Sequence, residues 1–247
     1  MNNNKVNFLF LVLSGFFICN VLVAEIIGGK IFSLEKVFGY DEISINLLGI
    51  SDLTLAFTAG VILWPFVFVL TDIINEYYGI RGVKRITYLS IALILYAFIM
   101  IFISMALPGA DFWLSIDKNM NNAYNLTLGQ SLWIIIGSII AFLIGQILDV
   151  HVFHWIKRRT GDRWVWLRAN GSTLVAQLVD SFVVLFIAFG IGAGWPINKV
   201  LALCVLNYSY KAIVAILLTP LLYLIHYVID QYLGETLSLE LKQSAQE

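Results

Sequence analysis

Charged residues are scarce in this sequence. Asp, Glu, Lys and Arg make up 13% of the 247 residues, whereas 60% are apolar, and an average soluble domain is about 25% charged. Together with a mean hydropathy of +0.87, this composition excludes a soluble enzyme and predicts an integral membrane protein that contacts lipid. The 15 basic and 16 acidic residues nearly cancel, so no nucleic-acid partner is expected.

Cysteine and the common catalytic motifs are also scarce. Cys19 and Cys204 are the two cysteines, and each lies in an apolar run, which excludes a disulfide framework. The sequence has no phosphate-binding glycine loop, so neither bound ATP nor another cofactor is expected. Ser172 and Thr173 are interpreted as the N-terminal cap of a helix and not as nucleophiles for His226, so no enzymatic activity is expected.

Long apolar runs dominate the remainder of the chain. About 20 apolar residues cross a bilayer as a helix, and the sequence has six such runs, at 8–29, 53–78, 85–107, 131–156, 171–194 and 198–230. Alternation at Ile43, Ile45 and Leu47 favours a short external hairpin or lid within 30–52. The predicted fold is an all-α membrane protein, a single domain over 1–247 with six transmembrane helices and a hairpin-like loop between the first two.

The positions of Lys and Arg predict the orientation, because these residues resist translocation across the membrane. In a six-span chain one side carries Lys5, Arg81, Lys84, Arg85, Lys157, Arg158, Arg159, Arg163 and Arg168. The other side carries Lys30, Lys36, Lys118 and Lys199. Both termini are therefore predicted to be cytoplasmic.

Polar residues inside the apolar runs are the candidates for a site, because a charge at the bilayer centre costs at least about 2.5–3.5 kcal/mol. Spans five and six carry such residues: Thr173, Gln177, Asp180, Asn207, Tyr208 and Lys211. Asp180 and Lys211 lie at similar depth on consecutive antiparallel helices and can neutralise each other. Two interpretations remain open, a structural ion pair that joins helices and a polar substrate pocket near the midplane.

Span two has two further features. Asp72, Asn75 and Glu76 share a face before Gly79, where carboxylates oppose the negative end of the helix dipole. Arg81, Arg163 or Arg168 could compensate for them, either in a structural clamp or in gating and substrate exit. Trp64-Pro65 predicts a kink, which with Phe66 and Phe68 forms either one aromatic wall of a pocket or a simple bend.

Other polar residues are assigned ordinary roles. Glu25 lies near the outer end of span one, where its side chain can reach the interface, and a role in the site is the alternative. Asp149, His151 and His154 lie beside a basic segment, so they are interpreted as interfacial residues and not as metal ligands. In span four the small residues Gly137, Ala141 and Gly145 predict close helix packing.

Two long motifs carry a family resemblance. Trp64-Pro65 followed by Thr71-Asp72-Ile73-Ile74-Asn75-Glu76-Tyr77-Tyr78-Gly79 resembles the queuosine precursor transporter family, formerly described as vitamin uptake transporters. The second motif, from Trp166 to Asp180, resembles that family's second signature, although Arg168-Ala169-Asn170-Gly171 departs from its usual Arg-Asn spacing. The resemblance extends from span one to about residue 230.

The resemblance implies uptake of 7-cyano-7-deazaguanine or 7-aminomethyl-7-deazaguanine for queuosine-modified tRNA. It also implies a fold similar to the substrate-binding subunits of energy-coupling-factor transporters. Such a base presents adjacent N–H and NH₂ donors that one carboxylate can accept, so Asp180 or Glu76 is expected on the donor edge. Asn207, Gln177 or Lys211 is expected on the carbonyl edge, and aromatic rings on the flat faces.

Other functions remain open at this point. One is a vitamin-binding membrane subunit that depends on a separate ATP-driven module, and another is a non-transporting membrane scaffold. Asp180, Glu76 or Asp72 could carry a proton, and the chain could form a homo-oligomer. Localisation in the bacterial inner membrane is expected in each case.

Overall fold

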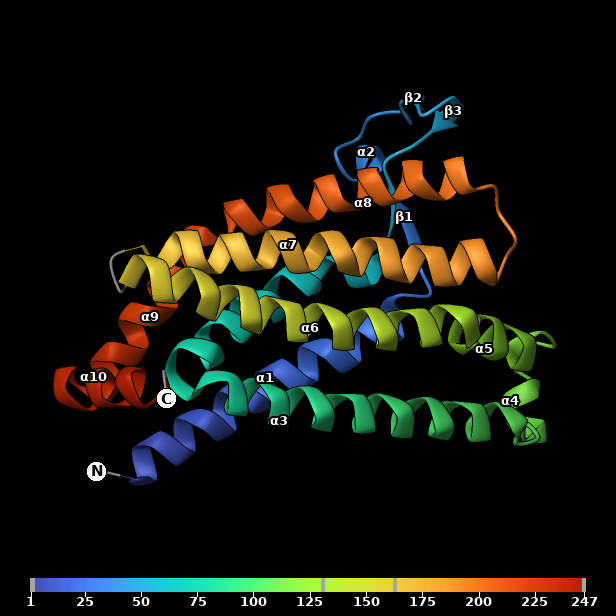
Figure 1. The fold of residues 1–247 in the computed structure, drawn as a ribbon. Coiled ribbons are helices and arrows are strands. Elements are labelled where there is room, and N and C mark those ends of the chain that lie inside the picture. Colours follow the sequence, from blue (N-terminus) through green and yellow to red (C-terminus); the bar gives the residue numbers. More distant parts are fainter. Residues whose placement is uncertain (1–2, 130–131, 162–163, 246–247) are drawn as a thin grey trace.

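The computed structural model describes residues 3–129, 132–161 and 164–245. It is a bundle of long helices, α1 (Asn3–Ile27), α3 (Trp64–Ala106), α6 (Leu132–Thr160), α7 (Val165–Leu185) and α8 (Ile197–Leu217), and these five are long and apolar enough to cross a membrane. Both termini lie at one end of the bundle and the short strands near the other (Figure 1). We call these the termini end and the strand end. The all-α membrane class is confirmed.

α3 contains two of the predicted spans. Its 43 residues would reach about 65 Å at 1.5 Å per residue, twice the thickness of a bilayer core. Gly79 interrupts the helix with a φ of 64°, and the chain doubles back so that the second half returns toward the strand end (Figure 1). Six membrane crossings require that both halves of α3 cross the bilayer, so the six-span count stays a prediction.

The segment between α1 and α3 is built differently from the expectation. The strands β1 (Ile31–Ser33) and β4 (Ala56–Thr58) pair antiparallel, with Phe32 opposite Phe57. β2 (Ile45–Leu47) and β3 (Ile50–Leu53) form the predicted hairpin, and the one-turn helix α2 spans Leu34–Val37. Span two therefore does not begin at residue 53: a 3₁₀ turn, Ala59–Ile62, precedes α3.

Proline explains two corrections to the helix boundaries. Pro65 lies in the first turn of α3, where no backbone N–H is needed, so Trp64-Pro65 starts this helix and does not kink it. Likewise, Pro220 opens α9 (Thr219–Leu233), so the predicted 198–230 span is two helices that meet at Leu218. Beyond α9 the chain forms α10 (Glu235–Ser244), which the apolar pattern did not predict.

The start and the end of span five differ as well. α7 begins at Val165, with Trp164 at its N-cap, so Ser172 and Thr173 are buried inside the helix and do not cap it. A π-helical segment, Phe186–Ile191, continues α7. The loop at 108–130 contains α4 (Asp111–Leu114) and α5 (Met120–Leu128), and residue 131, the predicted start of span four, lies outside the described residues.

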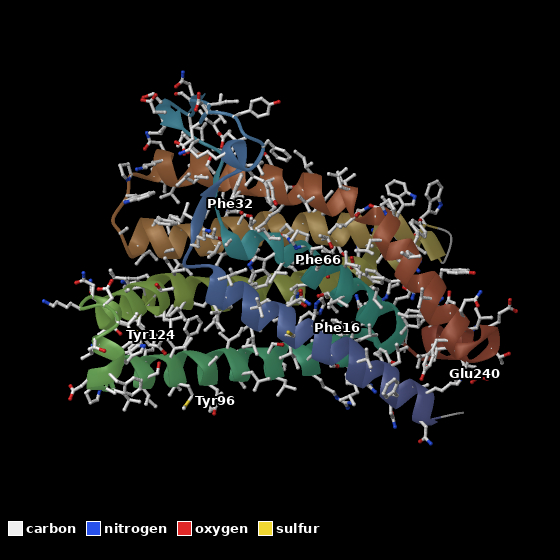
Figure 2. The ribbon with its side chains drawn as sticks, turned by 180° about the vertical axis from the view of Figure 1, so that it is seen from behind. Phe16, Phe32, Phe66, Tyr96, Tyr124 and Glu240 are labelled. Carbon is white, nitrogen blue, oxygen red and sulfur yellow. The ribbon has the colours of Figure 1, made fainter. Side chains whose placement is uncertain are left out.

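Apolar side chains also cover much of the outside of the bundle. Phe16 and Tyr96, on α1 and on the second half of α3, point away from the bundle in Figure 2 and are more than half exposed. Inside, the small residues predicted on α6 meet α7: a Cβ on Gly137 would lie 3.1 Å from the carbonyl oxygen of Val184. The close contact of α6 and α7 is thus confirmed.

Candidate functional site: a polar cavity at the strand end

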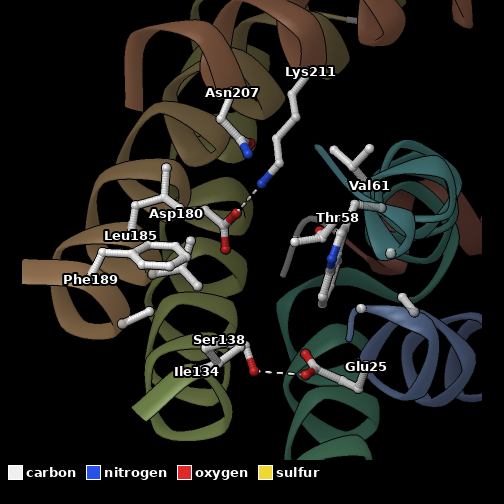
Figure 3. Close-up of a pocket in the computed structure, with 16 residues that line it drawn as sticks. Glu25, Thr58, Val61, Ile134, Ser138, Asp180, Leu185, Phe189, Asn207 and Lys211 are labelled. Atoms are coloured by element: carbon white, nitrogen blue, oxygen red, sulfur yellow. Dashed lines mark hydrogen bonds and ion pairs between the residues drawn. The ribbon is translucent and has the colours of Figure 1, made fainter. Parts of the chain in front are cut away.

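A cavity of about 90 Å³ lies among the halves of the helices nearest the strand end. Its walls come from the end of α1, the 3₁₀ turn and start of α3, the start of α6, the end of α7 and the middle of α8 (Figure 3). A cavity of this size holds several water molecules. Its polar lining residues are Glu25, Thr58, Ser138, Asp180, Asn207 and Lys211.

An ion pair between α7 and α8 forms one wall. Lys211 Nζ donates to Asp180 Oδ2 over 2.6 Å, and both residues are buried. On α6, Gly145 lies next to Asp180, and a Cβ there would lie 3.6 Å from the Cβ of Asp180, an ordinary packing distance. The predicted neutralisation of these two charges is confirmed, and the pair faces a cavity.

The other predicted site residues divide into two groups. Asn207 lines the cavity, and its Oδ1 is buried without a hydrogen-bond partner in the described part of the chain. Trp64 lines the cavity too. Gln177 is buried and Tyr208 partly exposed, and both lie outside the cavity lining. Phe68 faces a smaller cavity of about 10 Å³.

The sequence analysis missed several cavity residues. The side chain of Glu25 does not reach the interface, because the residue is only 6% exposed. Its Oε2 accepts a hydrogen bond from Ser138 Oγ over 2.7 Å. The 3₁₀ turn passes so close to α1 that a Cβ on Gly60 would lie 2.4 Å from the carbonyl oxygen of Ala24, and Gly60 and Glu25 line the same cavity. Phe189, from the π-helical segment, adds an aromatic ring to the wall.

A second polar cluster lies toward the termini end. Glu76 on α3 pairs with Arg168 on α7 at 2.8 Å and with Lys157 on α6 at 3.1 Å, and all three residues are buried. Arg168 is thus one of the cations expected to compensate Glu76, whereas Arg163 lies outside the described residues. The cluster borders a cavity of about 410 Å³ that α9 and α10 also line.

Between the two cavities lies a layer of buried polar side chains. Asp72 accepts a hydrogen bond from the hydroxyl of Thr173 over 3.3 Å. Asp149 and His154 are buried and not interfacial, and His154 bonds to Asn75 at 2.9 Å, whereas His151 is exposed. Within the described ranges, no three His, Cys, Asp or Glu side chains gather as metal ligands would.

These features define a multi-pass helical membrane protein with a charged internal cavity. Its sequence matches the profile of the family described as "Putative vitamin uptake transporter" over residues 58–225. The chain belongs to this family, which confirms the resemblance drawn from the two motifs. A multi-pass helical membrane protein of this family lies in the inner membrane of bacteria.

Two curated relatives are similar to this chain. The "Probable queuosine precursor transporter" of Bacillus subtilis (strain 168) is 30% identical over 169 residues, which covers 67% of this chain and 70% of the relative. The "Queuosine precursor transporter" of Escherichia coli (strain K12) is 28% identical over 160 residues, covering 64% and 67%. No solved structure matches the chain, so the expected similarity to energy-coupling-factor subunits stays a prediction.

Proposed function

We propose that this protein imports a queuosine precursor, 7-cyano-7-deazaguanine or 7-aminomethyl-7-deazaguanine, for tRNA modification. The family and the names of its two relatives support transport of this class of base. The observation that carries the proposal is the buried Asp180–Lys211 pair, which lines a small cavity and is not packed against apolar neighbours on all sides.

The chemistry of the cavity suits a deazaguanine. The base presents two adjacent N–H donors, which a carboxylate accepts together, and a carbonyl oxygen, which requires a donor. Asp180 supplies the carboxylate, and the ammonium of Lys211 and the amide of Asn207 are the donors beside it. Trp64 and Phe189 supply rings that can cover a flat solute.

The two polar clusters suggest how the base would pass. Lys and Arg are concentrated toward the termini end, which predicts that this end is cytoplasmic and that the strand end faces outside. The cavity at the strand end would therefore receive the base from outside. The Glu76–Arg168–Lys157 cluster closes the opposite end. Import in this scheme requires the cluster to separate after the base is bound, which would release it into the cavity beside α9 and α10.

Queuosine content of tRNA tests the proposal. Cells that cannot make the precursor would express the full chain and receive either deazaguanine at low external concentration. We expect modified tRNA to return with the wild type and to stay absent with Asp180→Asn at equal membrane abundance. Glu240→Gln, an exposed acid on α10, is the matched control and should behave as the wild type. Absence of modified tRNA with well-expressed wild type would refute the proposal.

A further inference from the structure

The charges that line the cavity do not cancel. Three of its described lining residues are ionisable, namely Glu25, Asp180 and Lys211. Lys211 is paired with Asp180 at 2.6 Å, and Glu25 lies across the cavity from this pair, beside Ser138 (Figure 3). With every group in its usual ionised form the lining carries a formal charge of −1.

Three elements fix the position of the Glu25 carboxylate. α1 carries the residue near its last turn, Gly60 of the 3₁₀ turn packs against the backbone of the preceding residue, Ala24, and α6 donates the Ser138 hydroxyl over 2.7 Å. The carboxylate thereby lies in the wall of the cavity at low exposure, away from bulk water. A buried carboxylate favours a ligand that brings a positive charge or donors to it.

We propose that Glu25 is a specificity residue that selects the cationic aminomethyl base over the neutral cyano base. This inference rests on the proposed function, in which the donor edge of the ring binds Asp180. The 7-substituent then lies on the far side of the bicyclic ring, toward Glu25 and Ser138. An ammonium group there donates to the carboxylate and balances its charge.

The cyano group cannot do the same. Its nitrogen only accepts hydrogen bonds, so it offers the carboxylate neither a donor nor a positive charge, and the neutral base would fill the cavity beside Glu25 without stabilising the carboxylate. Selectivity is the difference between two affinities, and an unfavourable contact with one base contributes as much as a favourable contact with the other. The Ser138 hydroxyl is compatible with both substituents, because it both donates and accepts.

Competition between the two bases tests the inference. The full chain would be reconstituted in lipid vesicles near pH 7, and each unlabelled base would compete with uptake of the other in labelled form. For the wild type we expect the aminomethyl base to compete at a concentration at least about tenfold lower than the cyano base. Glu25→Gln should reduce this preference to about threefold or less, by weakening the aminomethyl base while uptake of the cyano base persists.

Matched variants separate charge from other effects. Ser138→Ala removes the hydroxyl and keeps the charge, so the preference should survive, and Glu42→Gln, an exposed acid outside the cavity, should change nothing. The inference would be overturned if the wild type prefers the cyano base or takes up both bases equally well. It would also be overturned if Glu25→Gln keeps the wild-type preference, or if this variant inserts well into the membrane but takes up neither base. If that variant does not accumulate in the membrane, the wild-type ratio decides alone. Uptake of neither base by the wild type would instead refute the proposed function.

Discussion

Removing one partner of the Asp180–Lys211 pair should destabilise the protein strongly. At 2.6 Å between Nζ and Oδ2, two unit charges attract by about 6 kcal/mol at an effective dielectric constant near 20. The cost of taking both ions out of water offsets much of this attraction, so the intact pair contributes little net stability. Lys211→Met leaves Asp180 buried without its cation, and the expected loss is about 3–5 kcal/mol.

A double-mutant cycle measures this effect and separates the two interpretations of the pair. Thermal unfolding of the purified chain in detergent should show lower stability for Asp180→Asn and for Lys211→Met. The double variant should recover most of the loss, because no charge remains buried. Uptake should be lost in all three variants, because the proposed contacts with the substrate are removed. Single variants that unfold at the same temperature as the wild type would refute the electrostatic argument. Normal uptake by the double variant would show that the pair has a structural role and does not bind the substrate.

Two further predictions concern the ends of the bundle. Gly79→Ala should lower the free energy of unfolding by about 1–3 kcal/mol, because φ at this position is 64° and the new Cβ would lie 2.6 Å from the carbonyl oxygen of Ala245. Gly15→Ala is the control. A Cβ there has nothing within 4 Å, so this variant should be as stable as the wild type or more stable. At the other end, desolvation raises the pKa of Glu35, but hydrogen bonds from the Leu55 backbone N–H and the Ser33 hydroxyl outweigh it and hold the pKa below 4.5. Since the folded pKa is the lower one, this stabilisation is complete above the unfolded value and is lost as the pH falls through the folded value. Protection factors for hydrogen exchange of 31–58, taken relative to the intrinsic exchange rate at each pH, should therefore fall at acidic pH, and Glu35→Gln should flatten this dependence; protection factors that do not change with pH would contradict the assignment.

The features best predicted from the sequence are those that a bilayer makes costly. A charge in an apolar helix requires a partner, so the similar depth of Asp180 and Lys211 on consecutive helices was enough to predict their pairing. Glu76 at the unfavourable end of its helix likewise required a cation, and Arg168 supplies it. Neither argument needs more than the depth of a residue and the direction of its helix.

The boundaries of the helices could not be predicted as well, because one local pattern permits two structures. Pro65 fits both a kink inside a helix and the first turn of one, and the pairing of β1 with β4 decides between them. That pairing joins segments more than 20 residues apart. Strands of three residues are too short to show a clear alternation of apolar and polar residues in the sequence. Ser172-Thr173 resembles a cap, but α7 begins about two turns earlier, at Val165.

Glu25 shows the same limit at the site itself. A single carboxylate near the end of an apolar run has the sequence pattern of a side chain that reaches the interface. The 3₁₀ turn that packs beside it, with Gly60 against the backbone of Ala24, lies more than 30 residues later, and Ser138 comes from a helix more than 100 residues later. No property of the residues around Glu25 encodes either contact.

The positions of the two family motifs now have a structural reason. α3 contributes Trp64 to the cavity and Glu76 to the ion-pair cluster, and α7 contributes Asp180 and Arg168 to the same two places. Each helix therefore connects the strand end to the termini end over about three turns. If the helices move as rigid units, a displacement of α7 along α3 that separates Arg168 from Glu76 must also move Asp180 relative to Trp64. In the proposed mechanism, binding at one end and closure at the other would therefore be coupled through the same pair of helices, which carry both motifs.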